Sequence, residues 1–494
     1  MYKTEFHETI SCVGKKSEYA SLLSAIVDRK YRFTYYGEKL SDKHPFGKCV
    51  MLLNTEIINI SYCIKNSVNR VLFFHRGYIL SPKDVVLLSE LEQRYIRESA
   101  YLALKELNVI KLLFDVLKKN VALTSFPMHI QMEHTTFCNA KCIMCDHYIA
   151  HNRGSRHLTL NTVRTIEPLL PYATLIVMHG NGEPLINPNL PEILSLYKKY
   201  QVSLSLNTNL SYLPDDILWL LKSQCRSIHV SCDGSNEQQY ESIRLGLSYS
   251  EFVKNVKRLQ SVCSNTEKVL EVVLMRQNIK DAVNFVKFAY DNGFSEIIFN
   301  ALGCNKWIKN EHDGLHNFLP AAQYFCSAAK SEGIRLGIKV ETPFDSASNS
   351  IYNSISLPNI CCTTREQGLE NSKKLHKQYE WYTNTIAVEQ LDLRCIWDHV
   401  EACSTHGICE YPFAKTYIDL NGNVSFCCPA SRKIIDSISN ERSFPDIWNS
   451  KAYQSMRESF YQKRLPLLCR DCYFIQRRDL RFLDIEEGGN TEYK

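Results

Sequence analysis

The chain has 494 residues, of which 45% are hydrophobic and 22% charged, with a formal net charge of +5 at pH 7. This length exceeds one ordinary core, and the composition is that of a globular protein. The small positive charge is unlike the strongly basic face of a nucleic-acid binder, so we predict no nucleic-acid partner. We find no apolar signal segment and no long uncharged apolar run, so we expect a cytoplasmic protein without a membrane span.

The 20 cysteines are the unusual feature of this composition. In a large chain without an export signal, so many thiols favour metal binding over disulfides. Some of them stand in helix-like or strand-like segments, where free cysteine behaves as a small buried hydrophobe. We predict that role for four cysteines: Cys225, Cys232, Cys263 and Cys326.

Residues 1–125 begin with short β-type runs at 31–36, 49–53, 57–64 and 71–80. A helix start follows, with Ser81 as N-cap and Pro82 in the first turn. Helical periodicity then runs from residue 85 to 119, with a break expected near Asn108. These patterns predict an N-terminal α+β domain. It either only packs against the rest of the chain or recognises a substrate or leader peptide, and the sequence leaves both roles open.

From residue 126 to 340, strand patterns alternate with helix patterns. Strands are expected at 129–133, 175–179, 203–206, 227–231, 269–274 and 296–299, and helices at 160–169, 191–200, 214–222, 250–262 and 279–292. Repeated βα units form a parallel sheet with helices outside. We therefore predict an α/β fold with a partial (β/α)6 TIM-like barrel, which a further helix and strand at 320–331 and 335–340 extend.

Residues 341–408 show no regular pattern and are rich in Ser, Asn and Thr. A long irregular segment of this kind is usually functional or a linker, so we expect it to cover the substrate site or to join domains. It holds four cysteines: Cys361, Cys362, Cys395 and Cys403. Incidental buried thiols are the simplest interpretation, while a third cluster and a catalytic thiol stay open.

Three cysteines stand close together after the first predicted barrel strand, in Phe137-Cys138-Asn139-Ala140-Lys141-Cys142-Ile143-Met144-Cys145. Disulfides cannot pair all three, and three thiolates suit one face of a small metal cluster. Iron–sulfur clusters usually have four cysteine ligands, so three would leave one iron open for another ligand. The alternative is a zinc loop whose fourth ligand is His134, His147 or His151.

This C-x3-C-x2-C motif resembles that of the radical S-adenosylmethionine (radical SAM) superfamily. In that family the three cysteines hold a [4Fe-4S] cluster, and the amino and carboxylate groups of SAM bind its open iron. The resemblance implies reductive cleavage of SAM to a 5′-deoxyadenosyl radical, which removes a hydrogen atom from a substrate. It also implies a flavodoxin- or ferredoxin-type electron donor. Met144 replaces a residue that is often aromatic in the family and contacts adenine, and a thioether can also pack on a ring.

Gly180-Asn181-Gly182-Glu183-Pro184 follows the second predicted strand and is similar to the family's Gly-Gly-Glu-Pro motif. Asn181 replaces the first glycine of that motif. The resemblance implies that Gly182 and Glu183 hold the SAM amino group, which needs a tight backbone and a carboxylate acceptor.

Two further turns and one helix-like stretch resemble family motifs in the expected order. Asn207-Thr208-Asn209 is similar to a Thr-Asn-Gly turn, with Leu210 in place of glycine, and Ser231-Cys232-Asp233-Gly234 is similar to Ser-x-Asp-Gly. Tyr240-Glu241-Ser242-Ile243-Arg244 is similar to Tyr-x-x-Ile-Arg. The resemblance implies that Asn209 and Ser231 contact the ribose and that Arg244 reaches the SAM carboxylate. These residues follow successive strand ends, where barrel sites form.

A second cysteine group occupies residues 409–480, with metal ligands expected at Cys409, Cys427, Cys469 and Cys472. Asn421-Gly422 between apolar runs predicts a hairpin that returns Cys427 towards Cys409; Cys428 is the alternative to Cys427. The spacing is similar to the SPASM or twitch extension of radical SAM enzymes, which carries auxiliary [4Fe-4S] clusters. No cysteine follows Cys472, so we predict one auxiliary cluster, with a zinc ribbon as the alternative. Residues 481–494 form a polar tail.

Three functions stay open. We favour a SPASM-type radical SAM oxidoreductase or maturase that oxidises a peptide, as in RiPP-type or protein maturation, because an auxiliary cluster favours oxidative outcomes such as dehydrogenation or cross-linking. The second is dehydrogenation or epimerisation of a small molecule, such as a sugar, an aminoglycoside or a nucleotide. The third is a zinc protein without enzymatic activity. The sequence assigns no catalytic acid, base or hydrogen donor.

Overall fold

The computed structural model describes five N-terminal strands and residues 85–145, 156–302, 313–315, 318–344, 409–427, 434–439, 441–462, 464–466, 469 and 484–485. Several sequence predictions lie outside these residues: Ser81, the run 57–64, His147, His151, Cys361, Cys362, Cys395, Cys403, Cys428 and Cys472. Within the described part of the chain, no helix is long and apolar enough to cross a membrane.

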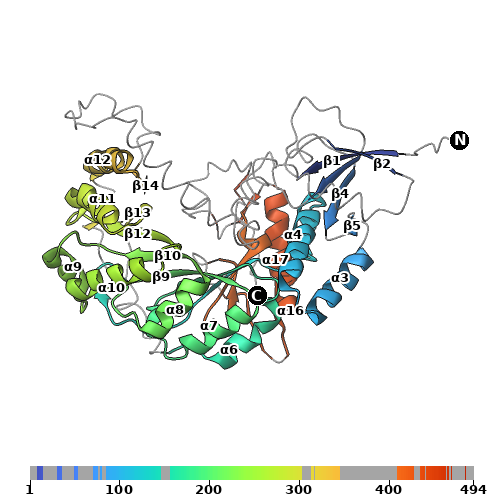
Figure 1. Ribbon diagram of the computed structural model, residues 1–494, viewed down its shortest axis with the longest axis horizontal. Helices are drawn as coiled ribbons and strands as arrows, with labels where there is room; N and C mark the ends of the chain where they lie inside the picture. Colours follow the sequence, from blue (N-terminus) through green and yellow to red (C-terminus); the bar gives the residue numbers. More distant parts are fainter. Residues whose placement is uncertain are drawn as a thin grey trace, which may run out of the picture.

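A ten-stranded sheet organises most of the described chain (Figure 1). Its order is β14-β13-β12-β10-β9-β8-β6-β15-β16-β17, and every pair from β14 to β15 is parallel. The seven barrel strands are β6 (His129–Met132), β8 (Leu175–Met178), β9 (Ser203–Thr208), β10 (Cys225–Ser231), β12 (Glu267–Leu274), β13 (Glu296–Ala301) and β14 (Lys339–Glu341). The predicted α/β fold with a partial parallel barrel is confirmed, and β14 extends its six βα units as expected.

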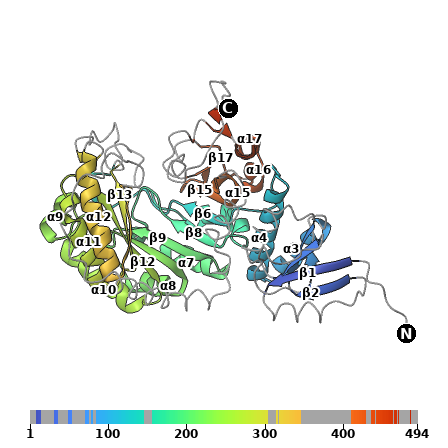
Figure 2. The same cartoon turned by 90° about the horizontal axis from the view of Figure 1, so that it is seen from above.

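Helices connect these strands and cover one side of the sheet (Figures 1 and 2). Several begin at a side-chain cap: Thr159 accepts from Thr162 N, Asn236 from Gln239 N, and Ser248 from Glu251 N. The helices are α6 (Leu160–Thr165), α7 (Leu190–Lys199), α8 (Asp215–Gln224), α9 (Glu237–Ile243), α10 (Tyr249–Val262), α11 (Ala282–Asp291) and α12 (Leu319–Leu336), with short 3-10 turns η1 (Glu167–Leu169), η2 (Pro184–Ile186) and η3 (Ile279–Asp281).

The two faces of the barrel sheet differ in polarity. Buried and partly exposed residues alternate along β10, β12 and β13, as successive side chains of a strand point to opposite faces. The face towards the helices is apolar and fully buried, with residues such as Ile228, Val230, Leu270 and Val272. We call the other side the concave face. Its polar residues include Ser205, Asn207, Ser227, His229, Ser231, Glu267, Glu271 and Glu296.

The N-terminal region forms a separate sheet of order β2-β1-β3-β4-β5. Its strands are β1 (Glu8–Gly14), β2 (Tyr31–Tyr35), β3 (Cys49–Leu53), β4 (Arg70–His75) and β5 (Tyr78–Leu80), and only β4 and β5 pair antiparallel. Helices α3 (Val85–Arg97) and α4 (Tyr101–Leu117) follow, and α4 lies between this sheet and the barrel (Figure 2).

The predicted helix break near Asn108 is wrong. The helix ends at Arg97 and restarts at Tyr101, after Ser99 adopts a φ of 52°. Asn108 lies inside α4 and is fully buried. Its Nδ2 donates to Phe126 O at 3.0 Å, and its Oδ1 accepts from Phe126 N at 2.9 Å. A residue that looked like a helix breaker instead binds the segment leading into the first barrel strand.

The C-terminal module contains α15 (Tyr411–Ala414), β15 (Lys415–Ile418), β16 (Asn423–Ser425), β17 (Asp436–Ser437), α16 (Phe444–Trp448) and α17 (Lys451–Tyr461). The hairpin predicted at Asn421-Gly422 is confirmed, with Gly422 at a φ of 82°. Strand β15 pairs parallel with β6, from Lys415 opposite His129 to Ile418 opposite Met132. The barrel sheet therefore continues directly into this module.

Candidate functional site

The first three cysteines lie in the loop that follows β6, which we call the cysteine loop (residues 135–145). Its end forms β7 (Lys141–Cys142), which pairs antiparallel with β11 (Arg244–Leu245) and sets Cys142 opposite Arg244. Ile143 N donates to Ile243 O at 3.0 Å. All three sulfur-bearing residues are partly exposed. Backbone bonds thus fix the loop without burying its cysteines completely.

Electrostatic effects show that the three cysteines lie near one another. Burial raises the pKa of Cys138 to about 12; the Ala140 N–H opposes this, and the charges of Glu183, Cys142 and Cys145 raise it further. Burial also raises the pKa of Cys142, which Arg244 lowers. A bound metal deprotonates such thiols outright.

The cysteine loop suits a cluster better than a single metal ion. Within the described residues, no three His, Cys, Asp or Glu side chains are gathered tightly enough to hold a single metal ion. A four-iron cluster is larger than one ion and holds its ligands farther apart. The fit to a cluster rests on three cysteines of one fixed loop that influence one another's pKa values.

Gly182 and Glu183 pack directly against the cysteine loop. A Cβ at Gly182 would lie 2.4 Å from Thr135 O and 2.5 Å from Phe137 O, so only glycine permits this approach of two backbones. Glu183 N donates to Phe137 O at 2.9 Å. The loop and the predicted amino-group residues are therefore joined through their main chains.

The Glu183 carboxylate is buried and accepts three hydrogen bonds. The donors are Thr208 Oγ1 at 2.7 Å, Asn209 N at 2.6 Å and Leu185 N at 3.1 Å. Burial raises the pKa of Glu183, while these donors and the charge of Arg244 oppose the shift. An ammonium partner would favour the ionised form, so this environment fits the predicted contact with the SAM amino group.

Asn181 stands where the family has glycine, and its hydrogen bonds to Glu133 explain this departure. Asn181 N and Nδ2 both donate to Glu133 Oε1, at 3.2 and 3.0 Å. Gly180 allows this approach, because a Cβ there would lie 2.7 Å from Glu133 Cγ. Sequence reasoning gave Glu133 no role, since it falls at the end of an apolar strand without a recognised motif.

Asn209 is bound to the cysteine loop. Its Nδ2 donates to Asn139 Oδ1 at 3.1 Å and lies 3.9 Å from Cys138 Sγ. Ser211 completes the link, accepting from Asn139 Nδ2 at 2.8 Å and donating to Asn209 Oδ1 at 2.6 Å. The adjacent Leu210 adopts a φ of 53°, the left-handed conformation that the family's glycine would supply. The predicted ribose contact of Asn209 stays a prediction.

Arg244 is buried and forms an ion pair with Asp233, with 2.6 Å between Nη2 and Oδ2. Burial alone would lower the pKa of Arg244, but the charge of Asp233 raises it, so the guanidinium stays charged. Its Nε is buried without a hydrogen-bond partner within the described residues. A carboxylate bound there would satisfy this N–H, which fits the predicted role.

Met144 and Ser231 are the two other predicted cofactor residues. Met144 packs with Ile143 and Val273 against Ile243, Met275 and Leu302, an apolar cluster separate from the main core. Ser231 ends β10 opposite Glu271 and is partly exposed on the concave face. Their contacts with adenine and ribose stay predictions.

The second cysteine group also comes together in part. Burial raises the pKa of Cys409; the Tyr411 N–H opposes this, and the charges of Glu410, Cys469 and Cys427 raise it further. These three cysteines, partly exposed, thus surround one place beside the β15–β16 hairpin. Cys472 lies outside the described residues. The four cysteines that were predicted to be buried are buried: Cys225, Cys232, Cys263 and Cys326.

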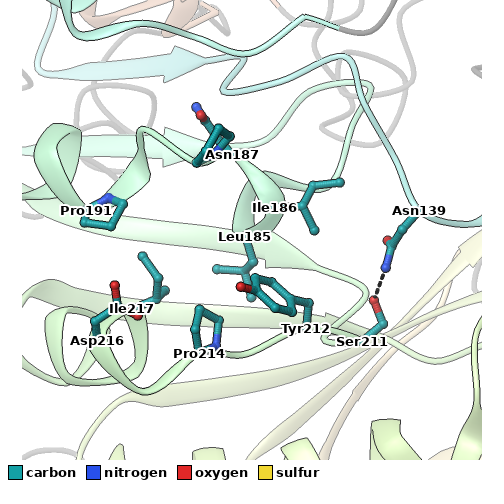
Figure 3. Close-up of a pocket in the computed structure, with 11 residues that line it drawn as sticks. Asn139, Leu185, Ile186, Asn187, Pro191, Ser211, Tyr212, Pro214, Asp216 and Ile217 are labelled. Atoms are coloured by element: carbon teal, nitrogen blue, oxygen red, sulfur yellow. Dashed lines mark hydrogen bonds between the residues drawn. The ribbon is translucent and has the colours of Figure 1, made fainter.

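A pocket of about 430 Å³ lies between the starts of α7 and α8 (Figure 3). The hydrogen bond from Asn139 to Ser211 closes the side that faces the cysteine loop. Its lining is Asn139, Leu185, Ile186, Asn187, Pro188, Pro191, Ser211, Tyr212, Pro214, Asp216 and Ile217. Its lining contains one carboxylate and no thiol, so it lacks the cysteine ligands that an iron–sulfur cluster needs.

Sequence reasoning missed a polar group on the concave face. His229 Nδ1 lies 2.9 Å from Glu271 Oε1, and Asn207 Nδ2 donates to Glu271 Oε2 at 3.2 Å. The signal was present on β10 as polar residues at alternate positions, Ser227, His229 and Ser231, and on β12 as Glu267 and Glu271. These residues match no short motif, so alternation alone did not mark them as functional.

The fold is a partial α/β barrel whose first loop carries three cysteines beside a buried glutamate. A further cysteine group lies in the C-terminal extension. Together these features are those of an iron–sulfur protein. Two family models agree with this class. Residues 132–289 match the radical SAM superfamily, and residues 409–473 match the SPASM iron–sulfur cluster-binding domain. The chain therefore contains a radical SAM domain followed by a SPASM domain. These domains imply SAM, its [4Fe-4S] cluster and auxiliary iron–sulfur binding, and favour iron over zinc.

Relatives and solved structures are similar over part of the chain. The mycofactocin maturase MftC of Mycobacterium ulcerans is 23% identical over 164 residues, 33% of this chain and 44% of that protein. The GTP 3′,8-cyclase of Peptoclostridium acidaminophilum is 23% identical over 192 residues, 36% of this chain and 58% of that protein. The chain thus spans about half the length of these relatives.

Among solved structures, Streptococcus suis SuiB bound to its precursor peptide SuiA aligns with a TM-score of 0.47 and 15% identity, covering 72% of this chain and 71% of SuiB. The enzyme anSMEcpe with bound AdoMet aligns with a TM-score of 0.46 and 14% identity, covering 71% of this chain and 84% of that chain.

Proposed function

We propose that this chain is a SPASM-type radical SAM oxidoreductase that modifies a peptide. Cys138, Cys142 and Cys145 hold the [4Fe-4S] cluster, Glu183 holds the SAM amino group, and Arg244 Nε donates to its carboxylate. When bound, the cluster and SAM supply the electron and the 5′-deoxyadenosyl radical that removes a hydrogen atom from the substrate. The protein's own residues bind, orient and screen the reacting groups.

One observation carries this proposal: the main-chain junction between the cysteine loop and Glu183. Gly182 lets the two backbones meet, and the bond from Glu183 N to Phe137 O locks them. A ligand that binds both the cluster and Glu183 needs these two partners at a fixed separation. A backbone hydrogen bond supplies such a separation better than mobile side chains do.

The N-terminal sheet supports a peptide substrate. Neither family model covers it, since their matches begin at residue 132. Strand β2 is at one edge of that sheet within the described residues. An extended peptide can add to a sheet edge through main-chain hydrogen bonds, which is a common mode of peptide recognition. One relative is named as a maturase.

A nucleotide substrate is the second candidate. Four of the matched relatives are named as GTP 3′,8-cyclases or probable ones. The concave face carries serine, asparagine, histidine and glutamate side chains, which suit a small polar molecule as well as a peptide side chain.

We infer one auxiliary cluster at Cys409, Cys427, Cys469 and Cys472, because four thiolates saturate one cluster. An electron acceptor of this kind favours an oxidative outcome, such as dehydrogenation or cross-linking. We also infer a flavodoxin- or ferredoxin-type donor for the initial electron.

The test begins with anaerobic reconstitution with iron and sulfide. We expect about eight irons per chain for two four-iron clusters and release of 5′-deoxyadenosine from SAM after reduction. The enzyme is then incubated separately with a pool of random 20-residue peptides and with GTP, and products are sought by mass spectrometry. Loss of two hydrogens from peptides supports the proposal, whereas a product from GTP alone favours the nucleotide candidate. Zinc without iron, and no 5′-deoxyadenosine, contradicts both.

A further inference from the structure

Four polar residues gather on the concave face beside the predicted cofactor residue Ser231: His179, Asn207, His229 and Glu271. Glu271 on β12 lies opposite Ser231 in register, and His229 on β10 lies opposite Asn207 on β9. His179 directly follows β8, beside Gly180. These side chains therefore come from four neighbouring strands and share one face. They stand next to the place where Ser231 is expected to meet the ribose.

His229 is held in one orientation by Glu271. Its Nδ1 lies 2.9 Å from Glu271 Oε1, while the other oxygen, Oε2, accepts from Asn207 Nδ2 at 3.2 Å. The His229 and Glu271 side chains remain 22% and 24% exposed. His229 Nε2 makes no hydrogen bond within the described residues. A carboxylate that orients one ring nitrogen and leaves the other open to the concave face is the arrangement of a proton-transfer histidine.

The pKa values of His179 and His229 are shifted in opposite directions. Burial lowers the pKa of His179; Glu271 opposes this shift and the charge of His229 adds to it. Burial alone would also lower the pKa of His229, but its hydrogen bond with Glu271 and the charges of Glu271, Glu267 and Glu296 raise it above the ordinary value. Neighbouring groups whose environments shift their pKa values in opposite directions are a common source of acid–base pairs.

We propose that His179 and His229, with Glu271 and Asn207 as positioning residues, form a proton-transfer site for a substrate hydroxyl, thiol or amine on the concave face. The substrate X–H gives its proton to an unprotonated ring nitrogen of His179, and X keeps the electron pair. His229 donates a hydrogen bond from Nε2–H to X. No oxidant enters this step. The inference rests on the proposed function, because it places the reacting part of the substrate beside the SAM site.

The charges near this site set its pH dependence. They include Glu133 and His129 on or next to β6, Asp233 after β10, Glu267 and Glu271 on β12, Glu296 on β13, and Lys339 and Glu341 on β14. Burial raises the pKa of Asp233, and the charge of Glu271 also raises it. Lys339 is occupied by ion pairs with Glu296 at 2.7 Å and Glu341 at 2.6 Å. Glu271 is thus the carboxylate in direct contact with His229. Glu341→Gln is a matched control. This substitution removes one carboxylate from the same face, and Glu341 contacts neither histidine.

The first test measures each histidine directly. The anaerobic holoenzyme is treated with diethyl pyrocarbonate, which modifies unprotonated imidazole, across a range of pH, and sites are quantified by mass spectrometry. We expect His229 to become reactive at higher pH than the partly exposed reference His157. Glu271→Gln keeps an oxygen that can accept hydrogen bonds but loses the charge, so the His229 midpoint should fall by about one pH unit or more, a tenfold change in the unprotonated fraction. Glu341→Gln should leave it unchanged. An equal midpoint in Glu271→Gln and the wild type overturns the inference.

The second test uses product formation from the peptide pool. The rate requires unprotonated His179 and protonated His229, so it should rise through the lowered pKa of His179 and fall through the raised pKa of His229. Glu271→Gln should move the falling limb to lower pH, and His179→Asn should reduce the rate about 100-fold or more. A profile that Glu271→Gln leaves unchanged contradicts the proton-transfer role even if the protein is folded. If the wild type forms no product from peptides or GTP, the proposed function fails, and the modification result alone decides this inference.

Discussion

Arg457 on α17 offers a sharp test of how the C-terminal module is attached. The side chain is fully buried. Its guanidinium donates from Nε to Pro412 O at 2.6 Å, from Nη1 to Val121 O at 2.8 Å, and from Nη2 to Trp448 O at 2.8 Å. It also lies 4.5 Å from the centre of the Trp448 ring. One side chain thus joins the segment before β6 to helices α15 and α16 of the C-terminal module.

Replacing Arg457 by lysine keeps the charge but removes the planar fork. An ammonium cannot reach all these carbonyl groups in their fixed directions. Two buried acceptors left unpaired cost about 1–3 kcal/mol each, and the lost stacking on Trp448 about 1 kcal/mol more. Burial lowers the pKa of Arg457 to about 10, so the group remains charged at neutral pH. We expect the free energy of unfolding to fall by about 3–7 kcal/mol.

Arg258→Lys is the matched control. Arg258 donates to Leu213 O at 2.7 Å and pairs with Asp215 at 2.5 Å, but its side chain is 34% exposed, so water replaces the lost bonds. The free energy of unfolding of Arg258→Lys should fall by less than about 1 kcal/mol. Urea unfolding followed by tryptophan fluorescence measures both variants, and iron content of the reconstituted proteins shows whether Arg457→Lys also loosens the auxiliary site. Equal destabilisation by the two substitutions would refute this reasoning.

Three further predictions concern the cofactor site. Cys142→Ala should lose about four irons and all SAM cleavage. Cys469→Ala should also lose about four irons but keep some SAM cleavage that is uncoupled from product formation. A normal product yield from Cys469→Ala would contradict the role of the auxiliary cluster. Gly182→Ala places a Cβ 2.4 Å from Thr135 O, so the cysteine loop must move, and equilibrium binding should show SAM affinity reduced about 10–100-fold. Burial raises the pKa of Glu183, and only its ionised form attracts an ammonium group, so SAM affinity should weaken as pH falls through that raised pKa. Glu183→Gln should abolish this dependence, and a wild-type affinity that does not change from about pH 8 to about pH 5 would exclude it.

Much of the fold followed from local patterns. Alternating strand and helix periods predicted the parallel barrel sheet, because each βα unit shows its apolar face in its own sequence. The Asn421-Gly422 turn likewise predicted the β15–β16 hairpin, since a positive φ at Gly422 is a local requirement. The cysteine spacing at Cys138 predicted a cluster loop, because one short loop can supply three ligands to the same cluster.

The helix break was misplaced because the partner of Asn108 lies outside its helix. Buried asparagine in a helix is unfavourable until a distant backbone satisfies it, and here Phe126 does so from the segment after α4. The role of Glu133 was missed for the same reason, because its hydrogen-bond partner Asn181 is 48 residues away. No local pattern reports such pairings.

The sequence by itself predicted which residues would carry the iron–sulfur and SAM chemistry, because the motifs at Cys138 and Glu183 are short and local. Only the tertiary structure decided how they are held: Gly182 against Thr135, Arg244 against Asp233, and β15 against β6. It also brought His179, His229 and Glu271 to one place on the concave face. These contacts join strands far apart in the chain, and parallel strands connected by helices meet only when the sheet forms, so their chemistry becomes visible only in the folded protein.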